Sequence, residues 1–232
     1  MELDLVLESQ RGHHPFTFAY TRMVNAGYTG RNQEEVRRHV EDLASKGIPA
    51  PESVPVLFPK VPQALVVDAS VEVYGSETSG EVEYVLLVVN EDEVYVALGS
   101  DHTDRHLEET DIPRSKQICP NVMSSTIWPL DEVAGQWDEL VLSAHVTSGG
   151  DRIRYQEGRL GVLLNPAGLM DFVKSKVPGP LQDLLIFSGT LGSLTGGFLF
   201  GECFDAELVD EHLGRRLSIS YGVLPLDYMA AK

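Results

Sequence analysis

Residues 79–88 of the chain read SGEVEYVLLV, and this stretch places two glutamates directly before an apolar run. The run is rich in Val, Leu and Tyr and predicts a strand that enters the hydrophobic core. Glu81 and Glu83 are two residues apart, so in a strand their side chains point to the same face, roughly 6–7 Å apart. Two carboxylates that face one site repel each other unless a cation lies between them. The stretch therefore predicts either a cation site at the mouth of a buried strand or a solvated strand end.

A third acid, Asp101, follows on the next predicted strand, after an acidic segment that is typical of a hairpin turn. A three-residue loop, 91–93, places Asp101 opposite Glu83 on the same face. A two-residue loop places it opposite Val82 on the other face, and a bulge restores either arrangement, so the sequence leaves the register open. Three converging carboxylates suit a hard cation such as Mg²⁺ or Mn²⁺. The chain has no cluster of Cys or His at zinc spacing.

The composition bounds the class of protein. The chain has 232 residues, 43% of them hydrophobic, and a formal net charge of −17. A chain this acidic repels phosphate backbones, and its two Arg pairs, 37–38 and 215–216, are isolated, so we expect no nucleic-acid partner. No apolar run has the length of a membrane span, and the N-terminus lacks the features of a signal peptide. The two cysteines suit a reducing compartment, so we expect a cytoplasmic protein without a membrane partner.

Strand-like segments are scattered along the chain with only two well-marked helices. One helix is predicted after Asn32, which forms a capping box with Glu35, and the other after Asn165, with Pro166 at its first position. Regular helical crossovers are missing, which favours an α+β, mostly β fold over a doubly wound α/β fold. We expect one domain over 1–232. It divides into N-terminal strands, 1–29, and a core that carries the motifs, 30–225.

Seven short motifs follow one another in a fixed order. They are GRNQEE (30–35), LFPKVP (57–62), GEVEY (80–84), GSDHTDR (99–105), SKQICP (115–120), YQEG (155–158) and SGTLGSL (188–194). In this order they resemble the C-terminal catalytic domain of the fumarylacetoacetate hydrolase superfamily. Each motif alone is a weak signal, but seven in order form a fairly specific one.

The resemblance implies a mixed β-roll with few short helices and a divalent cation, Mg²⁺ or Mn²⁺, held by Glu81, Glu83 and Asp101. It also implies a homodimer and an enzyme, a hydrolase or lyase, whose substrate is a small 2-oxo or 1,3-dioxo carboxylic acid. The reaction would be C–C cleavage of the acylpyruvate type or decarboxylation of the oxaloacetate type. Either reaction passes through an enolate that the metal stabilises.

The same resemblance assigns the remaining site residues. Arg105 and Lys116 stand where the superfamily stabilises the developing oxyanion, and we take them as catalytic. Backbone N–H groups of a glycine-rich loop can approach an anion closely. The residues implied to bind substrate are Thr190, Gly189, Lys60 and Gln156.

Two departures from the superfamily pattern concern the chemistry. The hydrolase branch activates water with a His on the helix after GRN, and Val36 occupies that position here. His39 and His102 are the two candidates for the base, although a regular strand turns His102 to the face opposite Asp101. Glu108 stands where some members have a Gln that binds the oxyanion, and a carboxylate donates a hydrogen bond only when protonated. The missing His favours reactions that need no activated water.

Three other interpretations stay open. The chain could be an isomerase or tautomerase of unsaturated diacids that uses the same site. It could be a non-catalytic small-molecule binding protein that keeps the fold. It could also be a metal-free domain in which Glu81 and Glu83 are solvated, and that interpretation predicts no effect of Mg²⁺ or Mn²⁺ on stability.

Overall fold

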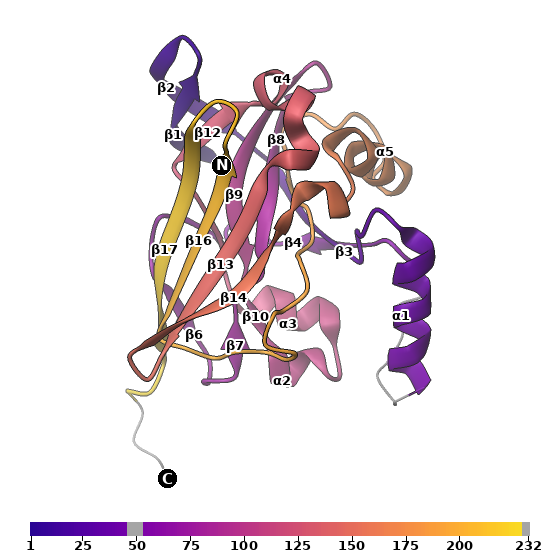
Figure 1. The fold of residues 1–232 in the computed structure, drawn as a ribbon, viewed down its shortest axis with the longest axis vertical. Helices are drawn as coiled ribbons and strands as arrows, with labels where there is room; N and C mark the ends of the chain where they lie inside the picture. Colours follow the sequence, from indigo (N-terminus) through magenta and orange to yellow (C-terminus); the bar gives the residue numbers. More distant parts are fainter. Residues whose placement is uncertain (46–52, 229–232) are drawn as a thin grey trace.

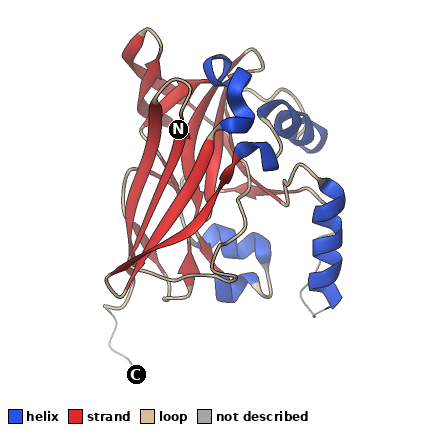
Figure 2. Cartoon of the chain, in the orientation of Figure 1, coloured by secondary structure: helices blue, strands red, loops and turns tan. Residues whose placement is uncertain are grey.

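The computed structural model describes residues 1–45 and 53–228 of the chain. Two sheets contain most of its strands, and Figure 2 shows the helices gathered along one side of them. Across the described residues, every helix is too short or too polar to cross a membrane. The predicted mostly β, α+β class is confirmed. The assignment of 1–232 to a single domain stays a prediction.

The stretch quoted first lies at the centre of the larger sheet. β8 (Val82–Asn90) pairs antiparallel with β9 (Glu93–Asp101) on one side and with β15 (Leu184–Phe187) on the other. Within the described residues this sheet has ten strands. Their order is β2 (Gly12–Ala19), β1 (Glu2–Ser9), β12 (Thr126–Pro129), β9, β8, β15, β3 (Arg22–Gly27) and β4 (Val56–Lys60), with β11 (Asn121–Met123) beside β9 and β5 (Leu65–Val67) beside β11.

The smaller sheet forms the second layer (Figure 1). In the part of the chain that the structure describes it has five strands, in the order β14 (Asp151–Arg159), β13 (Val141–Ser148), β16 (Cys203–Asp210), β17 (Arg215–Pro225) and β6 (Val71–Val73). β16 and β17 are neighbours in the sequence and form an antiparallel hairpin. A separate pairing joins β7 (Thr78–Ser79) to β10 (Thr103–Asp104), close in sequence to the acidic residues.

β8 is buried on both faces, which explains its apolar run. Tyr84 and Leu86 belong to the hydrophobic cluster shared with the smaller sheet. Val85 and Leu87 belong to a second cluster on the other face, shared with β1 and β2. Burying one such side chain contributes roughly 1.5–3 kcal/mol. Because side chains alternate along a strand, Glu83 shares the face of Val85 and Leu87, and the core fixes that orientation.

Both predicted helix starts are confirmed. Asn32 precedes the first helix and accepts from the Glu35 amide at 3.3 Å, and Asn165 accepts from the Gly168 amide at 2.9 Å. Pro166 is the first residue of the second helix. The helices are α1 (Gln33–Ser45), α2 (Arg105–Glu108), α3 (Ile112–Ile118), α4 (Leu130–Val133) and α5 (Pro166–Lys176), with 3₁₀ turns η1 (Ala134–Glu139) and η2 (Leu160–Val162). Figure 1 shows α2 and α3 together at one end of the sheets, where β7 and β10 also lie.

Candidate metal centre

The β8–β9 hairpin brings three acids together through a register that the sequence left open. The turn has two residues, 91–92, and a bulge between Val88 and Asn90 shifts the pairing. As a result Asp101 lies beside Glu81, whose carbonyl accepts from the Asp101 amide at 3.1 Å. The two-residue loop alone would have turned Asp101 away, and the bulge returns it to the face of the glutamates.

The three carboxylates form a compact cluster. Ligand oxygens of Glu81, Glu83 and Asp101 lie within 4.8 Å of one another. Glu83 and Asp101 are buried, and Oδ1 of Asp101 has no hydrogen-bond partner among the described residues. Leaving a buried carboxylate oxygen unpaired costs free energy that a coordinating cation would recover. An all-oxygen, anionic donor set of this kind fits a hard divalent cation.

Lys116, on α3, reaches two of the same carboxylates. Its Nζ donates to Oδ2 of Asp101 at 2.5 Å and to Oε2 of Glu81 at 3.1 Å. Burial favours the neutral amine, but Asp101 and Glu81 more than compensate and raise the pKa of Lys116 above its ordinary value. The side chain is therefore a fixed positive charge at the edge of the cluster.

Arg105, the first residue of α2, lies on the other side of Glu81. Its Nη1 donates to Oε2 of Glu108 at 2.7 Å and its Nε donates to Oγ of Ser79 at 2.7 Å. Nη2 is 3.1 Å from Oε1 of Glu81, close enough for an ion pair but poorly aligned for a hydrogen bond. Nη2 has no hydrogen-bond partner among the described atoms, although the side chain is only 4% exposed. The cluster thus holds an unpaired N–H donor as well as an unpaired oxygen.

The two glutamates titrate in opposite directions. Burial alone would raise the pKa of Glu81, but Lys116 and Arg105 lower it to about 2. Burial raises the pKa of Glu83 well above its ordinary value, and the charges of Asp101 and Glu81 raise it further. The difference arises because Glu81 contacts both cations and Glu83 contacts neither of them. Its surroundings thus favour the protonated form of Glu83, and a divalent ion bound at the cluster would compete with that proton.

The glycine-rich loop after β15 packs onto β8 at the glutamates. Thr190 donates from Oγ1 to the Val82 carbonyl at 2.8 Å, and Oε1 of Gln156 accepts from the Val82 amide at 3.1 Å. The Gln156 amide also donates to Oγ1 of Thr190 at 2.8 Å. Both backbone groups of the residue between Glu81 and Glu83 are thus fixed by side chains. Thr190 and Gln156 hold the glutamate pair in place, and their role toward a substrate stays a prediction.

Gly189 contacts Glu83 through its backbone amide. Its N–H donates to Oε2 of Glu83 at 3.0 Å. Its φ of +86° lies in the left-handed region, and an added Cβ would be 2.4 Å from Oγ1 of Thr29 and 3.0 Å from the Ala26 carbonyl. Only glycine fits this close approach of two backbones.

Gly189→Ala is expected to destabilise the chain by about 2–5 kcal/mol, from left-handed strain and overpacking together. Gly192→Ala is the matched control, because an added Cβ there meets nothing within 4 Å and the backbone is not left-handed. Denaturant unfolding of both variants measures the difference. Equal stability of the two variants would show that Thr29 and the loop move apart at little cost.

Two other predicted residues, Lys60 and His102, lie differently. Lys60 is buried and donates to the carbonyls of Lys116 and Cys119, so it caps the end of α3, and burial lowers its pKa to about 8. His102 is enclosed on the opposite face, between Tyr221 at 3.0 Å and Thr78 at 2.9 Å. Burial lowers the pKa of His102 to about 3, and both ring nitrogens are occupied by these two partners, so its role as a base stays a prediction.

The remaining predicted base is His39. It belongs to α1, but its side chain lies outside the described residues, and its role stays a prediction.

Two aromatic residues at the site were not predicted. Tyr28 has a φ of 57°, a strained conformation for a bulky residue, and burial followed by Glu108 and Glu81 raises the pKa of its phenol. Phe198, in the glycine-rich loop, places its ring centroid 4.1 Å from Cζ of Arg105. Neither residue belongs to a motif quoted above, and no local pattern in the sequence points to either.

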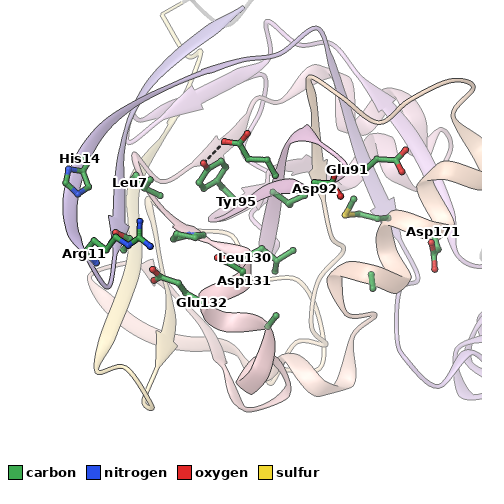
Figure 3. Close-up of a pocket in the computed structure, with 17 residues that line it drawn as sticks. Leu7, Arg11, His14, Glu91, Asp92, Tyr95, Leu130, Asp131, Glu132 and Asp171 are labelled. Atoms are coloured by element: carbon green, nitrogen blue, oxygen red, sulfur yellow. Dashed lines mark hydrogen bonds between the residues drawn. The ribbon is translucent and has the colours of Figure 1, made fainter.

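A cavity of about 890 Å³ lies away from the acids, at the turn end of the β8–β9 hairpin (Figure 3). β8 has nine residues, so roughly 30 Å separates the two ends. Several polar groups of the cavity are paired with one another or with neighbours: Tyr95 with Glu93 at 2.7 Å, and Glu91 with Lys174 at 2.7 Å. We place the candidate site at the carboxylates, where buried polar atoms lack partners.

The comparisons with known proteins agree with this fold. A family model described as "Protein of unknown function (DUF2848)" matches residues 26–221. No curated protein matches the sequence. Among solved structures the chain is similar to 2-keto-3-deoxy-D-arabinonate dehydratase complexed with magnesium and 2,5-dioxopentanoate, at 15% identity and a TM-score of 0.62, over 88% of this chain and 73% of that one.

Two further structures extend the likeness. 5-Carboxymethyl-2-hydroxymuconate delta-isomerase from Mycobacterium smegmatis is 15% identical with a TM-score of 0.61, over 100% of both chains. A yeast fumarylacetoacetate hydrolase family protein is 15% identical with a TM-score of 0.57, over 92% of this chain and 97% of that one. The resemblance predicted from the seven motifs is confirmed for the fold, which is the fumarylacetoacetase-like mixed β-roll.

Proposed function

The chain belongs to the DUF2848 family, and from that premise and the geometry of the carboxylates we propose that it is a divalent-metal-dependent enzyme acting on a small 2-oxo or 1,3-dioxo carboxylic acid. The observation that carries the proposal is a pair of buried atoms without partners in the described residues. Oδ1 of Asp101 has no partner there and suits a cation, and Nη2 of Arg105, which forms only a poorly aligned ion pair with Glu81, keeps N–H groups for an oxygen of a bound acid. A metal-bound carboxylic acid supplies both.

Glu81, Glu83 and Asp101 are the proposed ligands. Mg²⁺ or Mn²⁺, when bound there, would act as a Lewis acid on the keto oxygen of a 2-oxo acid. The similar dehydratase structure contains magnesium together with a dioxo acid, which supports this choice of ion and ligand class.

The cations of the site would stabilise the negative charge that forms on the substrate during the reaction. When the bond from the carbon next to the keto group to the departing carboxylate or acyl carbon breaks, its electron pair moves toward the keto oxygen and creates negative charge there. Nη2 of Arg105 and the ammonium of Lys116 are fixed in a buried environment where they stabilise that charge. Glu108 cannot replace the amide donor that some superfamily members have, since it accepts from Arg105; instead it holds the guanidinium in position.

The choice among reactions depends on the base. Val36 stands where the hydrolase branch has its His, and His102 is turned away from the carboxylates. Among the side chains that the structure describes at this site, no imidazole is available to activate water. We therefore favour decarboxylation or tautomerisation, which need no activated water, over hydrolytic C–C cleavage. The homodimer implied by the resemblance and the cytoplasmic location expected from the cysteine usage stay proposals.

The test is metal-dependent stability and oxalate binding. At a concentration one hundred times its dissociation constant, Mg²⁺ or Mn²⁺ should stabilise the fold by about 2.7 kcal/mol. For a chain of this size that is a rise in melting temperature of roughly 5–10 °C. Calorimetry should show that oxalate, which resembles the enolate of pyruvate, binds only when the metal is present.

The outcomes separate the interpretations. No thermal shift with either ion and no oxalate binding would leave the carboxylates as solvated or structural residues. Binding of metal and oxalate without turnover of any acylpyruvate or of oxaloacetate would favour the non-catalytic binding protein. NaCl at matched ionic strength is the control for nonspecific charge screening.

A further inference from the structure

A chain of buried hydrogen bonds lies beside the acids, on the face of the strand opposite the Asp101 carboxylate. Oη of Tyr221 is 2.9 Å from Oγ of Ser100 and 3.0 Å from Nδ1 of His102. Ser100 and His102 directly precede and follow Asp101 in the sequence, so their side chains point to the other face of the extended chain. One phenol hydroxyl therefore contacts the residues on both sides of a proposed metal ligand.

The chain of hydrogen bonds continues from Ser100 to Glu81. Oγ of Ser100 accepts from the Glu81 amide at 3.2 Å, and the Asp101 amide donates to the Glu81 carbonyl at 3.1 Å. Both backbone groups of Glu81 are therefore bonded to residues 100 and 101, and the Tyr221 hydroxyl contacts that segment from the opposite face. A shift of the segment would move the carboxylates of Glu81 and Asp101 together.

The other end of the chain leads toward Arg105. Nε2 of His102 is 2.9 Å from Oγ1 of Thr78. The next residue, Ser79, accepts from Nε of Arg105 at 2.7 Å. Each link needs one hydrogen, so either neutral tautomer of His102 satisfies the links from Thr78 to Ser100.

Tyr221 belongs to the smaller sheet and is held firmly there. It lies in β17, is 2% exposed, and its ring packs on Phe204 of β16 with the centroids 5.3 Å apart. At Gly80, the residue before Glu81, an added Cβ would be 2.5 Å from the Tyr221 hydroxyl oxygen and 2.7 Å from the Phe204 ring. The smaller sheet thus packs directly against the backbone that carries the acids, and only glycine leaves room for it.

The partners of Tyr221 differ from those that a buried tyrosine needs for its own stability. A single carbonyl is enough to pair a buried hydroxyl, as for Tyr20, which is 1% exposed and donates to the Pro62 carbonyl at 2.9 Å. Tyr221 instead contacts two side chains, and they flank Asp101. A buried network whose members are all paired favours one geometry over the alternatives.

We infer that Tyr221 is a positioning residue for the proposed metal ligands Glu81 and Asp101, and that it acts through Ser100 and His102. The inference rests on the proposed function and adds to it a residue from the second sheet. His102 positions Asp101 in this arrangement, and no proton transfer is assigned to it. Removing the Tyr221 hydroxyl leaves every proposed ligand present and loosens their geometry.

Tyr221→Phe tests the inference, with Tyr20→Phe as the matched control, since both variants lose one buried hydroxyl and keep the ring. Calorimetry should show that Tyr221→Phe binds Mg²⁺ and Mn²⁺ about tenfold more weakly than wild type, the lower end of what losing an outer-shell partner costs, because Tyr221 acts through the backbone. Tyr20→Phe should bind both ions as wild type does. The electron paramagnetic resonance spectrum of bound Mn²⁺, which reports ligand geometry, should change in Tyr221→Phe alone.

A double-mutant cycle tests the route through Ser100. The loss of affinity in Ser100→Ala/Tyr221→Phe should be smaller than the two single losses combined, because both substitutions break the same link. Thermal unfolding with a chelator checks that each variant is folded.

The outcomes are distinct. A merely structural Tyr221 would lower the melting temperature in Tyr221→Phe and leave the ion affinity and the Mn²⁺ spectrum unchanged, and that result would overturn the inference while the proposed function stands. Fully independent losses in the cycle would also overturn it, since Tyr221 would then act without Ser100. If wild type binds neither Mg²⁺ nor Mn²⁺, the proposed function falls and the inference falls with it.

Discussion

Replacing Glu83 with Gln is expected to abolish the metal-dependent binding of oxalate while leaving the metal-free chain at least as stable as wild type. Glu83 contacts neither Lys116 nor Arg105, and within the described residues its Oε2 accepts from the Gly189 amide alone. Gln has the same shape and keeps an oxygen for that amide. Losing an anionic ligand should lower metal affinity by at least about 100-fold, the upper end of what losing an outer-shell partner costs.

The stability of this variant should also depend on pH in a defined direction. Burial, Asp101 and Glu81 raise the pKa of Glu83 well above its ordinary value of 4.5. Above that value the unfolded chain has lost the proton that the folded chain still holds, so the stability of the metal-free wild type falls as pH rises. Gln cannot ionise and lacks this slope. The advantage of Glu83→Gln over wild type should therefore grow with pH until Glu83 itself ionises.

Denaturant unfolding with a chelator present, from pH 5 to 8, measures the stability difference, and calorimetry of oxalate in Mg²⁺ measures the site. Glu93→Gln is the matched control, because Glu93 lies at the turn end of the same hairpin and is exposed. It should leave oxalate binding unchanged. Wild-type affinity for Mg²⁺ and oxalate in Glu83→Gln would remove Glu83 from the proposed ligand set.

The positions of Glu81 and Glu83 could be predicted from the local sequence, and the position of Asp101 could not. The shared face of Glu81 and Glu83 follows from the two-residue period of a strand and needs no tertiary information. The position of Asp101 depends on the bulge between Val88 and Asn90, which no residue in the turn encodes. The preference for one register comes from burying both faces of β8, and that is a property of the whole sheet.

Helices α2 and α3 escaped prediction because they are too short for a hydrophobic period. Their caps were present in the sequence: Asp104 accepts from the Leu107 amide at 2.8 Å, and Asp111 accepts from the Arg114 amide at 3.1 Å. Asp residues at this spacing, with Pro113 in the first turn of α3, are the signal that could have found them. Arg105 lies on α2 and Lys116 lies on α3. The two helices that were not predicted therefore carry the two cations of the site.

Contacts between segments far apart in the sequence could not be predicted, for a different reason. The Gly189 amide and the Glu83 carboxylate are 106 residues apart in sequence, and the order of motifs pointed to both without predicting that they touch. The contact of Phe198 with Arg105 has no motif at all, because a phenylalanine in a glycine-rich loop carries no local signal of its partner. Such pairings follow from sheet topology, which a single sequence constrains weakly.

Lys116→Met is expected to destabilise the metal-free chain by about 3–5 kcal/mol, because it leaves the buried carboxylate of Asp101 without its cation and Glu81 with Arg105 alone. Lys116 Nζ contacts Asp101, which is 1% exposed, and Glu81, which is 18% exposed, so water cannot replace it.

Lys174→Met is the matched control: its pair with Glu91 is 54% and 47% exposed and should contribute only about 0–1 kcal/mol. Mg²⁺ should restore part of the loss in Lys116→Met, measured by denaturant unfolding with and without the ion, since a divalent cation supplies the missing positive charge to the same oxygens. If the two variants are equally stable, the contacts of Lys116 contribute nothing net to the fold; a large loss that Mg²⁺ does not reduce would mean that the carboxylates cannot hold the ion once the lysine is gone.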